Sequence, residues 1–164
     1  MIKRCSELKV ATHHEAAHVV AAWALDLPLQ FVKVNDNGSG TTKLSYFYLW
    51  TAMFREVSRD SVRKSALFVL AGDCGEQLVS FSLAKDEVTS DDYYAWFLAR
   101  KFRLDLGILR NEAEQIIVRE RDTVTEIAEE LYIKRFLGPY DLAIRRMNWL
   151  ARGSSTRSIV YQPA

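Results

Sequence analysis

This sequence has few cysteines, almost no net charge and no long apolar run, and each of these features excludes a class of protein. Only two cysteines occur, Cys5 and Cys74, in no C-x-x-C pair, so a disulfide framework has no support and two reduced thiols are expected. A net charge of +1 gives no electrostatic reason to expect nucleic acid or an anionic membrane as a partner. No apolar run approaches about 18 residues and no signal-peptide pattern opens the chain, so we expect no membrane span and a cytoplasmic location.

The rest of the composition is that of an ordinary globular domain. The 164 residues are 49% hydrophobic and 26% charged, which is enough to bury one core. We expect a single domain over residues 1–152 and a flexible tail over residues 153–164.

Apolar periodicity predicts a mostly α fold with one small β-hairpin after the first helix. The helices are expected at about 6–25, 59–81, 89–104, 111–138 and 140–151, the fourth capped at Asn111 and stopped by Gly138-Pro139. Two strand-like runs, 29–34 and 41–48, flank a turn rich in Asn and Gly. The aromatic run Tyr93, Tyr94, Trp96 and Phe97 is expected to pack in the core with one solvated face.

The first predicted helix carries all three histidines of the chain, within six positions. His14 and His18 are four residues apart, so their side chains project from one helix face and can bind a single metal ion. Glu15 follows the first of them and can reach a water molecule at the metal without being a ligand. This H-E-x-x-H spacing is typical of zinc peptidases, in which the glutamate acts as general base.

A catalytic zinc site needs a third protein ligand. His13 is adjacent to His14 and is turned about 100° away from it on a helix, so we expect it to face solvent or to support the site without binding the ion. The third ligand is then Cys74 or an acid. The acids in apolar helical surroundings are Asp73, Glu76, Asp91 and Asp92. The residues alone do not choose among them.

Four segments resemble the FtsH-type family of zinc metalloproteases, in its peptidase domain without the ATPase domain. Residues 11–21 (ATHHEAAHVVA) are similar to the family's A-Y-H-E-A-G-H-A-V-V-A helix, and residues 70–79 (LAGDCGEQLV) to L-G-G-R-A-A-E-E-L-V-F. Residues 89–100 are similar to S-N-D-L-x-x-A-T-x-x-A-R, and residues 121–142 resemble the closing helices. The resemblance implies Asp91 as the third zinc ligand, with Asp92 as the alternative if the register slips by one. It also implies Glu76 as a supporting acid near the metal helix.

What the resemblance implies for function is a stand-alone, ATP-independent zinc metalloendopeptidase with Glu15 as general base. No G-x-x-x-x-G-K-[ST] phosphate loop occurs, so these residues encode no ATPase. The expected partners are a peptide or unfolded protein substrate and either a second copy or a separate ATPase or adaptor. The alternative is a catalytically inert, zinc-binding module that acts in protein interaction or regulation. The missing ATPase motivates it, as does Ala17 at the family's glycine position.

Overall fold

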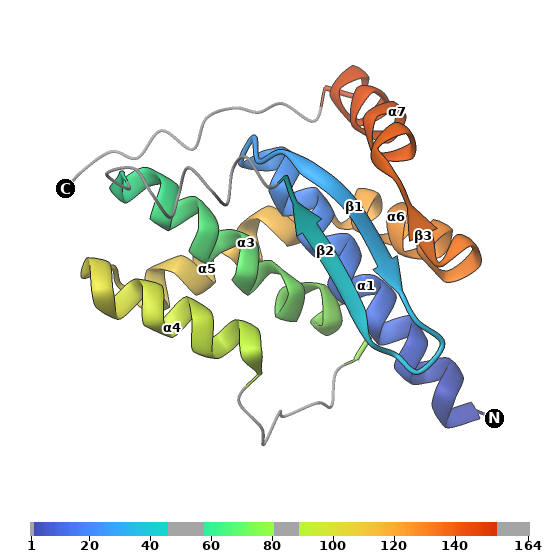
Figure 1. Ribbon diagram of the computed structural model, residues 1–164, viewed down its shortest axis with the longest axis horizontal. Helices are drawn as coiled ribbons and strands as arrows, with labels where there is room; N and C mark the ends of the chain where they lie inside the picture. Colours follow the sequence, from blue (N-terminus) through green and yellow to red (C-terminus); the bar gives the residue numbers. More distant parts are fainter. Residues whose placement is uncertain (1, 46–57, 81–88, 154–164) are drawn as a thin grey trace.

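The computed structural model describes residues 2–45, 58–80 and 89–153, and only the backbone of residues 2–6. Its six described helices are α1 (Ile2–Ala24), α3 (Arg59–Gln77), α4 (Ser90–Phe102), α5 (Leu106–Arg119), α6 (Arg121–Lys134) and α7 (Pro139–Ala151). Its strands are β1 (Leu29–Val34), β2 (Gly40–Leu44) and β3 (Phe136–Leu137). The predicted mostly α architecture is confirmed (Figure 1). No helix in the described ranges is long and apolar enough to cross a membrane.

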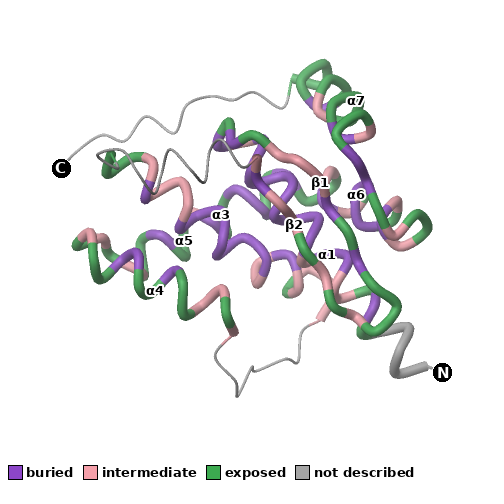
Figure 2. Tube along the Cα trace, viewed as in Figure 1, coloured by how far each residue is buried: buried purple, intermediate pink, exposed green. Residues whose placement is uncertain are grey.

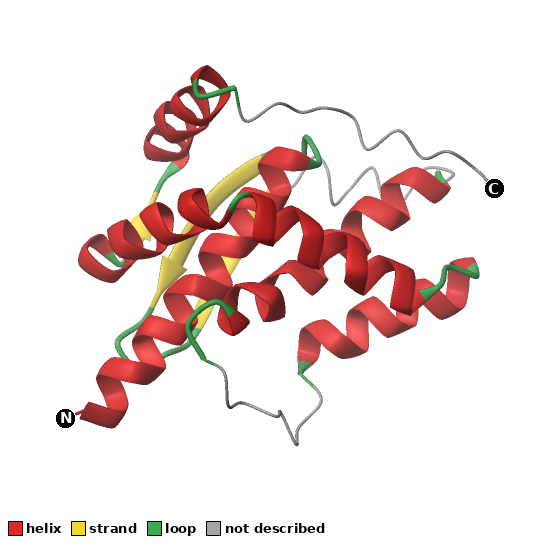
Figure 3. Cartoon of the chain, turned by 180° about the vertical axis from the view of Figure 1, so that it is seen from behind, coloured by secondary structure: helices red, strands yellow, loops and turns green. Residues whose placement is uncertain are grey.

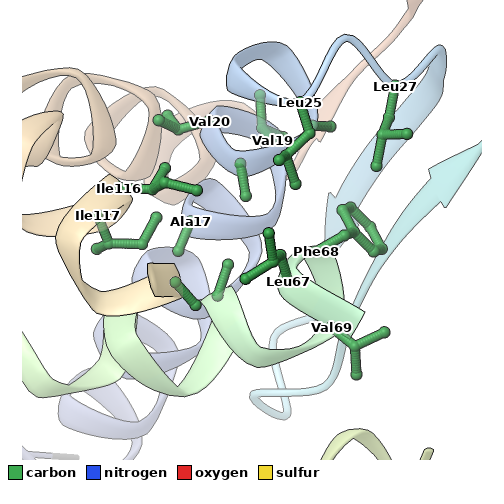
Figure 4. Close-up of a cluster of buried hydrophobic side chains, with 14 of the residues drawn as sticks. Ala17, Val19, Val20, Leu25, Leu27, Leu67, Phe68, Val69, Ile116 and Ile117 are labelled. Atoms are coloured by element: carbon green, nitrogen blue, oxygen red, sulfur yellow. The ribbon is translucent and has the colours of Figure 1, made fainter. Parts of the chain in front are cut away.

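Helix α1 runs through the centre of the molecule. It packs against α3 and α6, and the sheet crosses its remaining side (Figures 1 and 3). Every residue from Glu15 to Trp23 is therefore buried, whereas α4 and α7 expose most of their surface (Figure 2). The apolar contacts between α1, α3 and α5 involve residues such as Val20, Leu67 and Ile117 (Figure 4). Burial of these side chains is the main stabilising contribution to the fold.

The predicted hairpin is present but belongs to a three-stranded antiparallel sheet with the order β2-β1-β3. Strand β1 pairs with β2 from Leu29 opposite Leu44 to Val34 opposite Gly40. The turn between them needs Gly38, whose φ of 82° lies in the left-handed region. Strand β3 is only two residues long and pairs with the other edge of β1, so β2 is left at an edge of the described sheet.

Helix α4 begins where the sequence predicts. The Thr89 hydroxyl accepts a hydrogen bond from the backbone N–H of Asp92 at 3.1 Å, and the Asp92 carboxylate accepts one from the N–H of Thr89 at 3.4 Å. This capping box fixes the first turn of α4. The expectation of core packing for the aromatic run on this helix is wrong, because Tyr93, Tyr94, Trp96 and Phe97 are each more than 40% exposed.

The single long helix expected over 111–138 is wrong, because the chain forms α5 and α6 with a break at Glu120. Helix α5 begins earlier than expected, since Asp105 rather than Asn111 caps it by accepting a hydrogen bond from the N–H of Ile108 at 3.1 Å. The Glu120 side chain is only 6% exposed, and its carboxylate accepts a hydrogen bond from the Trp149 indole at 2.8 Å. The break thus orients a buried acid toward α7.

Other expected boundaries differ by a few residues. Helix α1 begins at Ile2 rather than near residue 6, and α3 ends at Gln77 rather than near residue 81. The last part of the expected second strand, residues 46–48, and the expected tail from residue 154 lie outside the described residues.

Candidate metal centre

Three side chains from two helices meet at the middle of α1. The Nε2 atoms of His14 and His18 lie 3.0 Å apart, and one carboxylate oxygen of Asp91, in the first turn of α4, lies 3.2 Å from the first and 3.3 Å from the second. Two ligands of one tetrahedral zinc, bound at about 2.0–2.1 Å, are roughly 3.3–3.4 Å apart. The triangle formed by these three atoms therefore has nearly the dimensions that a zinc ion requires.

The outer nitrogen of each histidine ring has a partner that sets its protonation. His18 Nδ1 donates to the backbone carbonyl of Phe68 at 2.8 Å, and His14 Nδ1 donates to the carboxylate of Glu76 at 2.7 Å. A carbonyl can only accept, so in neutral His18 the proton sits on Nδ1 and Nε2 carries a lone pair. The same tautomer of His14 is favoured by Glu76. Two lone pairs and a carboxylate oxygen thus converge, an arrangement that calls for a cation.

Electrostatics at this cluster also favour a bound positive charge. Burial acts to lower the pKa of His14, but hydrogen bonds with Asp91 and Glu76 outweigh it and raise the pKa to about 10. Burial likewise acts to raise the pKa of Asp91, but hydrogen bonds from the two histidines hold it well below its usual range. Without a metal, a proton on His14 is therefore strongly held between these acids.

Helix α3 approaches α1 closely enough to form the cluster because of a glycine. A Cβ atom at Gly72 would lie 2.5 Å from Nε2 of His14 and 2.6 Å from Nε2 of His18, so no larger residue fits without displacing both rings. One turn further, a Cβ at Gly75 would meet the Cβ of Ala17 at 2.5 Å. The two glycines thus allow α1 and α3 to approach closely at the cluster.

Glu15 lies on the other side of His14, beneath the sheet. Its side chain is 5% exposed, and one carboxylate oxygen accepts a hydrogen bond of 2.6 Å from the hydroxyl of Thr42 on β2. Its carboxylate lies against Gly40, where any Cβ would collide with it. A cavity of about 610 Å³ adjoins Glu15 and His14. The carboxylate is thus held beside His14 without belonging to the triangle.

The remaining candidates are placed elsewhere. Asp92 forms the capping box of α4 with Thr89 and pairs with Arg110 at 3.0 Å, so it does not join the histidines. Asp73 and Glu76 lie with His14 in a second possible ligand group on the Nδ1 side of its ring. Burial, together with nearby acids such as Asp73, raises the pKa of the Cys74 thiol to about 12, which disfavours the thiolate that a metal ligand needs.

His13 was expected to face solvent or to support the site, and the solvent-facing alternative is wrong. Its side chain is 4% exposed because α6 covers this side of α1, and Nδ1 donates to the backbone carbonyl of Lys9 at 2.9 Å. Burial lowers the pKa of His13, so the ring is neutral. It is not part of either possible ligand group found among the described residues.

Two contacts at the centre were not foreseen from the sequence. Thr42 lies in a strand whose pattern gives no sign of contact with Glu15, and the Phe68 carbonyl is a backbone group in the middle of a helix.

Comparison of the chain with protein-family models and with curated protein sequences gave no match. The resemblance to the FtsH-type peptidases therefore remains a prediction from the motifs.

Proposed function

We propose that this protein is a zinc-dependent metallopeptidase. The observation that carries the proposal is the convergence of His14, His18 and Asp91 beside the buried carboxylate of Glu15. Structural zinc sites use four protein ligands, whereas catalytic sites use three and leave a position open for water or substrate. A three-ligand group next to a cavity and an acid supports the catalytic kind.

The roles of the residues follow from their positions. His14, His18 and Asp91 would hold the ion, which when bound lowers the pKa of water to about 7 and polarises a carbonyl group. Glu15 would accept the proton of the attacking water and return it to the leaving amine. The Thr42 hydroxyl keeps one oxygen of Glu15 engaged at 2.6 Å, so the carboxylate is oriented before substrate arrives.

The alanine at the family's glycine position is matched by an exchange on α3. In the family's first motif a glycine stands at the position of Ala17, and in its second motif an alanine stands at the position of Gly75. This chain has alanine at the first position and glycine at the second. The two positions lie against each other between α1 and α3. The contact between α1 and α3 therefore still pairs one glycine with one alanine, and only the helix that carries the glycine differs. For this reason Ala17 does not argue for an inert site.

An extended peptide has a place to bind beside the centre. Strand β2 is at an edge of the described sheet, and Gly40 and Thr42 in it contact Glu15. Half of the backbone groups of an edge strand point away from its neighbour and can pair with an added strand. We infer that substrate binds along β2, with its scissile bond near Glu15 and His14.

The experiment that tests the proposal compares wild type with Glu15→Gln on a broad peptide library. We expect the variant to keep about one zinc per chain while cleavage falls about 10²–10⁴-fold, because only the general base is lost. Glu129→Gln, an exposed acid on α6, is the control and should cleave normally. Full cleavage by Glu15→Gln would remove Glu15 from this role. Zinc-loaded wild type that cleaves no peptide would favour the alternative, an inert zinc-binding module.

A further inference from the structure

The cavity beside the candidate centre has a definite position and shape. Its volume is about 610 Å³, within the range of ligand-binding pockets. One wall is the face of α1 from Glu7 to His14, a second is the hairpin turn at Asn37 and Gly38, and a third is the end of α3 at Glu76. Figure 1 shows the hairpin turn over the N-terminal half of α1.

Apart from His14 of the candidate centre, the ionisable side chains that line this cavity are all acidic. Three carboxylates face it, those of Glu7, Glu15 and Glu76, and none of its lining residues, all within the described part of the chain, is a lysine or an arginine. The carboxylate of Glu15 accepts a hydrogen bond from Thr42, and that of Glu76 accepts one from His14. Glu7 is exposed and takes no part in the candidate centre. Of the three carboxylates that line the cavity, that of Glu7 is therefore the one best placed to pair with a bound ligand.

The position of Glu7 sets the length of the group that reaches it. His14 is seven positions after Glu7 on α1, which is about 10 Å along the helix axis. A substrate residue whose carbonyl or amide lies at His14 needs a long side chain to place a charge there. Lysine and arginine combine such a stem with a cationic end.

We propose that this cavity binds a basic side chain of the peptide substrate, next to the scissile bond, and that Glu7 selects it. The inference rests on the proposed function for the position of the scissile bond. The binding preference itself is a property of the cavity and can be measured without turnover.

The test measures peptide binding by fluorescence anisotropy to zinc-loaded Glu15→Gln protein. Two N-acetylated, C-amidated peptides differ only in one central residue, arginine or its neutral isostere citrulline. We expect the arginine peptide to bind about tenfold more tightly, because its guanidinium gains charged hydrogen bonds in the cavity. The difference should shrink as salt is raised.

Second substitutions in the same background locate the effect. Glu7→Gln should reduce the difference between the two peptides to about twofold or less, and Glu7→Lys should favour a peptide with glutamate at the central position. Asp36→Asn is the matched control, since Asp36 is an acid of the adjacent turn that pairs with Arg135 and does not line the cavity. It should leave the tenfold difference intact.

Several outcomes would overturn the inference. These are equal binding of the arginine and citrulline peptides, no binding of either, or the same loss in Asp36→Asn as in Glu7→Gln. Tight binding of a citrulline peptide with a free N-terminus would assign the cavity to an α-amine instead. If wild type binds the arginine peptide but cleaves nothing, the proposed function fails while the inference stands. If wild type cleaves without preferring arginine, only the inference fails.

Discussion

The carboxylate of Glu76 illustrates how a single residue can orient the candidate centre from outside the group of His14, His18 and Asp91. It accepts a hydrogen bond from His14 Nδ1 at 2.7 Å and so directs the other ring nitrogen toward His18 and Asp91. Such partners fix the tautomer and raise the basicity of a metal-binding histidine.

Glu76→Ala should weaken zinc binding by about 10–100-fold, because His14 loses the acceptor that orients its ring. Glu76→Gln keeps an acceptor oxygen and should lose less. Competition with a zinc chelator of known affinity measures both variants. Equal affinity of wild type and Glu76→Ala would show that Glu76 has no positioning role.

The raised pKa of His14 predicts proton release on zinc binding. His14 has a pKa of about 10 in the metal-free protein, against 6.5 ordinarily, so at pH 8 it carries a proton that zinc must displace. Calorimetric titration with zinc in buffers of different ionisation enthalpy should show at least one proton released per ion at pH 8, from His14 and in part from zinc-bound water, and fewer above pH 10. No release at pH 8 would contradict the position given to His14.

The same shifts predict how the metal-free fold responds to pH. Protonated His14 contributes stability fully below pH 6.5, and this contribution is lost as the pH rises toward about 10. Ionised Asp91 contributes stability above pH 3.8, which is lost as the pH falls through its lowered pKa. Urea unfolding of metal-free protein should therefore give a higher free energy of unfolding at pH 6 than at pH 10.

At the scale of helices, the close contact of α1 with α3 brings the centre together. Gly72 and Gly75 bring the backbone of α3 against His14, His18 and Ala17, and any added methyl group must separate the two helices. Separation would also move Phe68 and Glu76, which orient the two histidine rings.

Gly75→Ala should lower the free energy of unfolding by about 1–3 kcal/mol, because overpacking outweighs the better helix propensity of alanine. Adding Ala17→Gly should recover part of the loss, since it removes one of the two groups that Gly75→Ala would meet, the other being the backbone carbonyl of His13. Urea denaturation of wild type, both single variants and the double variant measures the coupling. Strict additivity would show that the two positions do not share this contact.

At the scale of the whole molecule, the sequence predicted what local spacing encodes. The face shared by His14 and His18 follows from helical periodicity, and the start of α4 follows from its Thr89 cap. The burial of His13 did not, because it depends on α6 covering the far side of α1. The break at Glu120 has no glycine or proline to mark it and reflects a contact with Trp149, far along the chain.

The candidate third ligand, Asp91, shows the same limit. Asp91 and Asp92 are both acids in the first turn of α4, and residue chemistry alone left the choice between them open. The packing of α4 on α3 places Asp91 beside His18, 73 positions before it, while Asp92 belongs to the capping box with Thr89. The family resemblance supplied the choice that residue chemistry left open.

The most direct test of the account is the zinc content of purified wild type, Asp91→Ala and Asp92→Ala by elemental analysis. We expect about one zinc per chain in wild type and in Asp92→Ala, which should lose only about 1 kcal/mol of stability with its cap. Asp91→Ala should lose most of its zinc, because two histidines alone bind weakly. Wild type without zinc after reconstitution, or Asp91→Ala that retains a full equivalent, would contradict the metal centre of His14, His18 and Asp91.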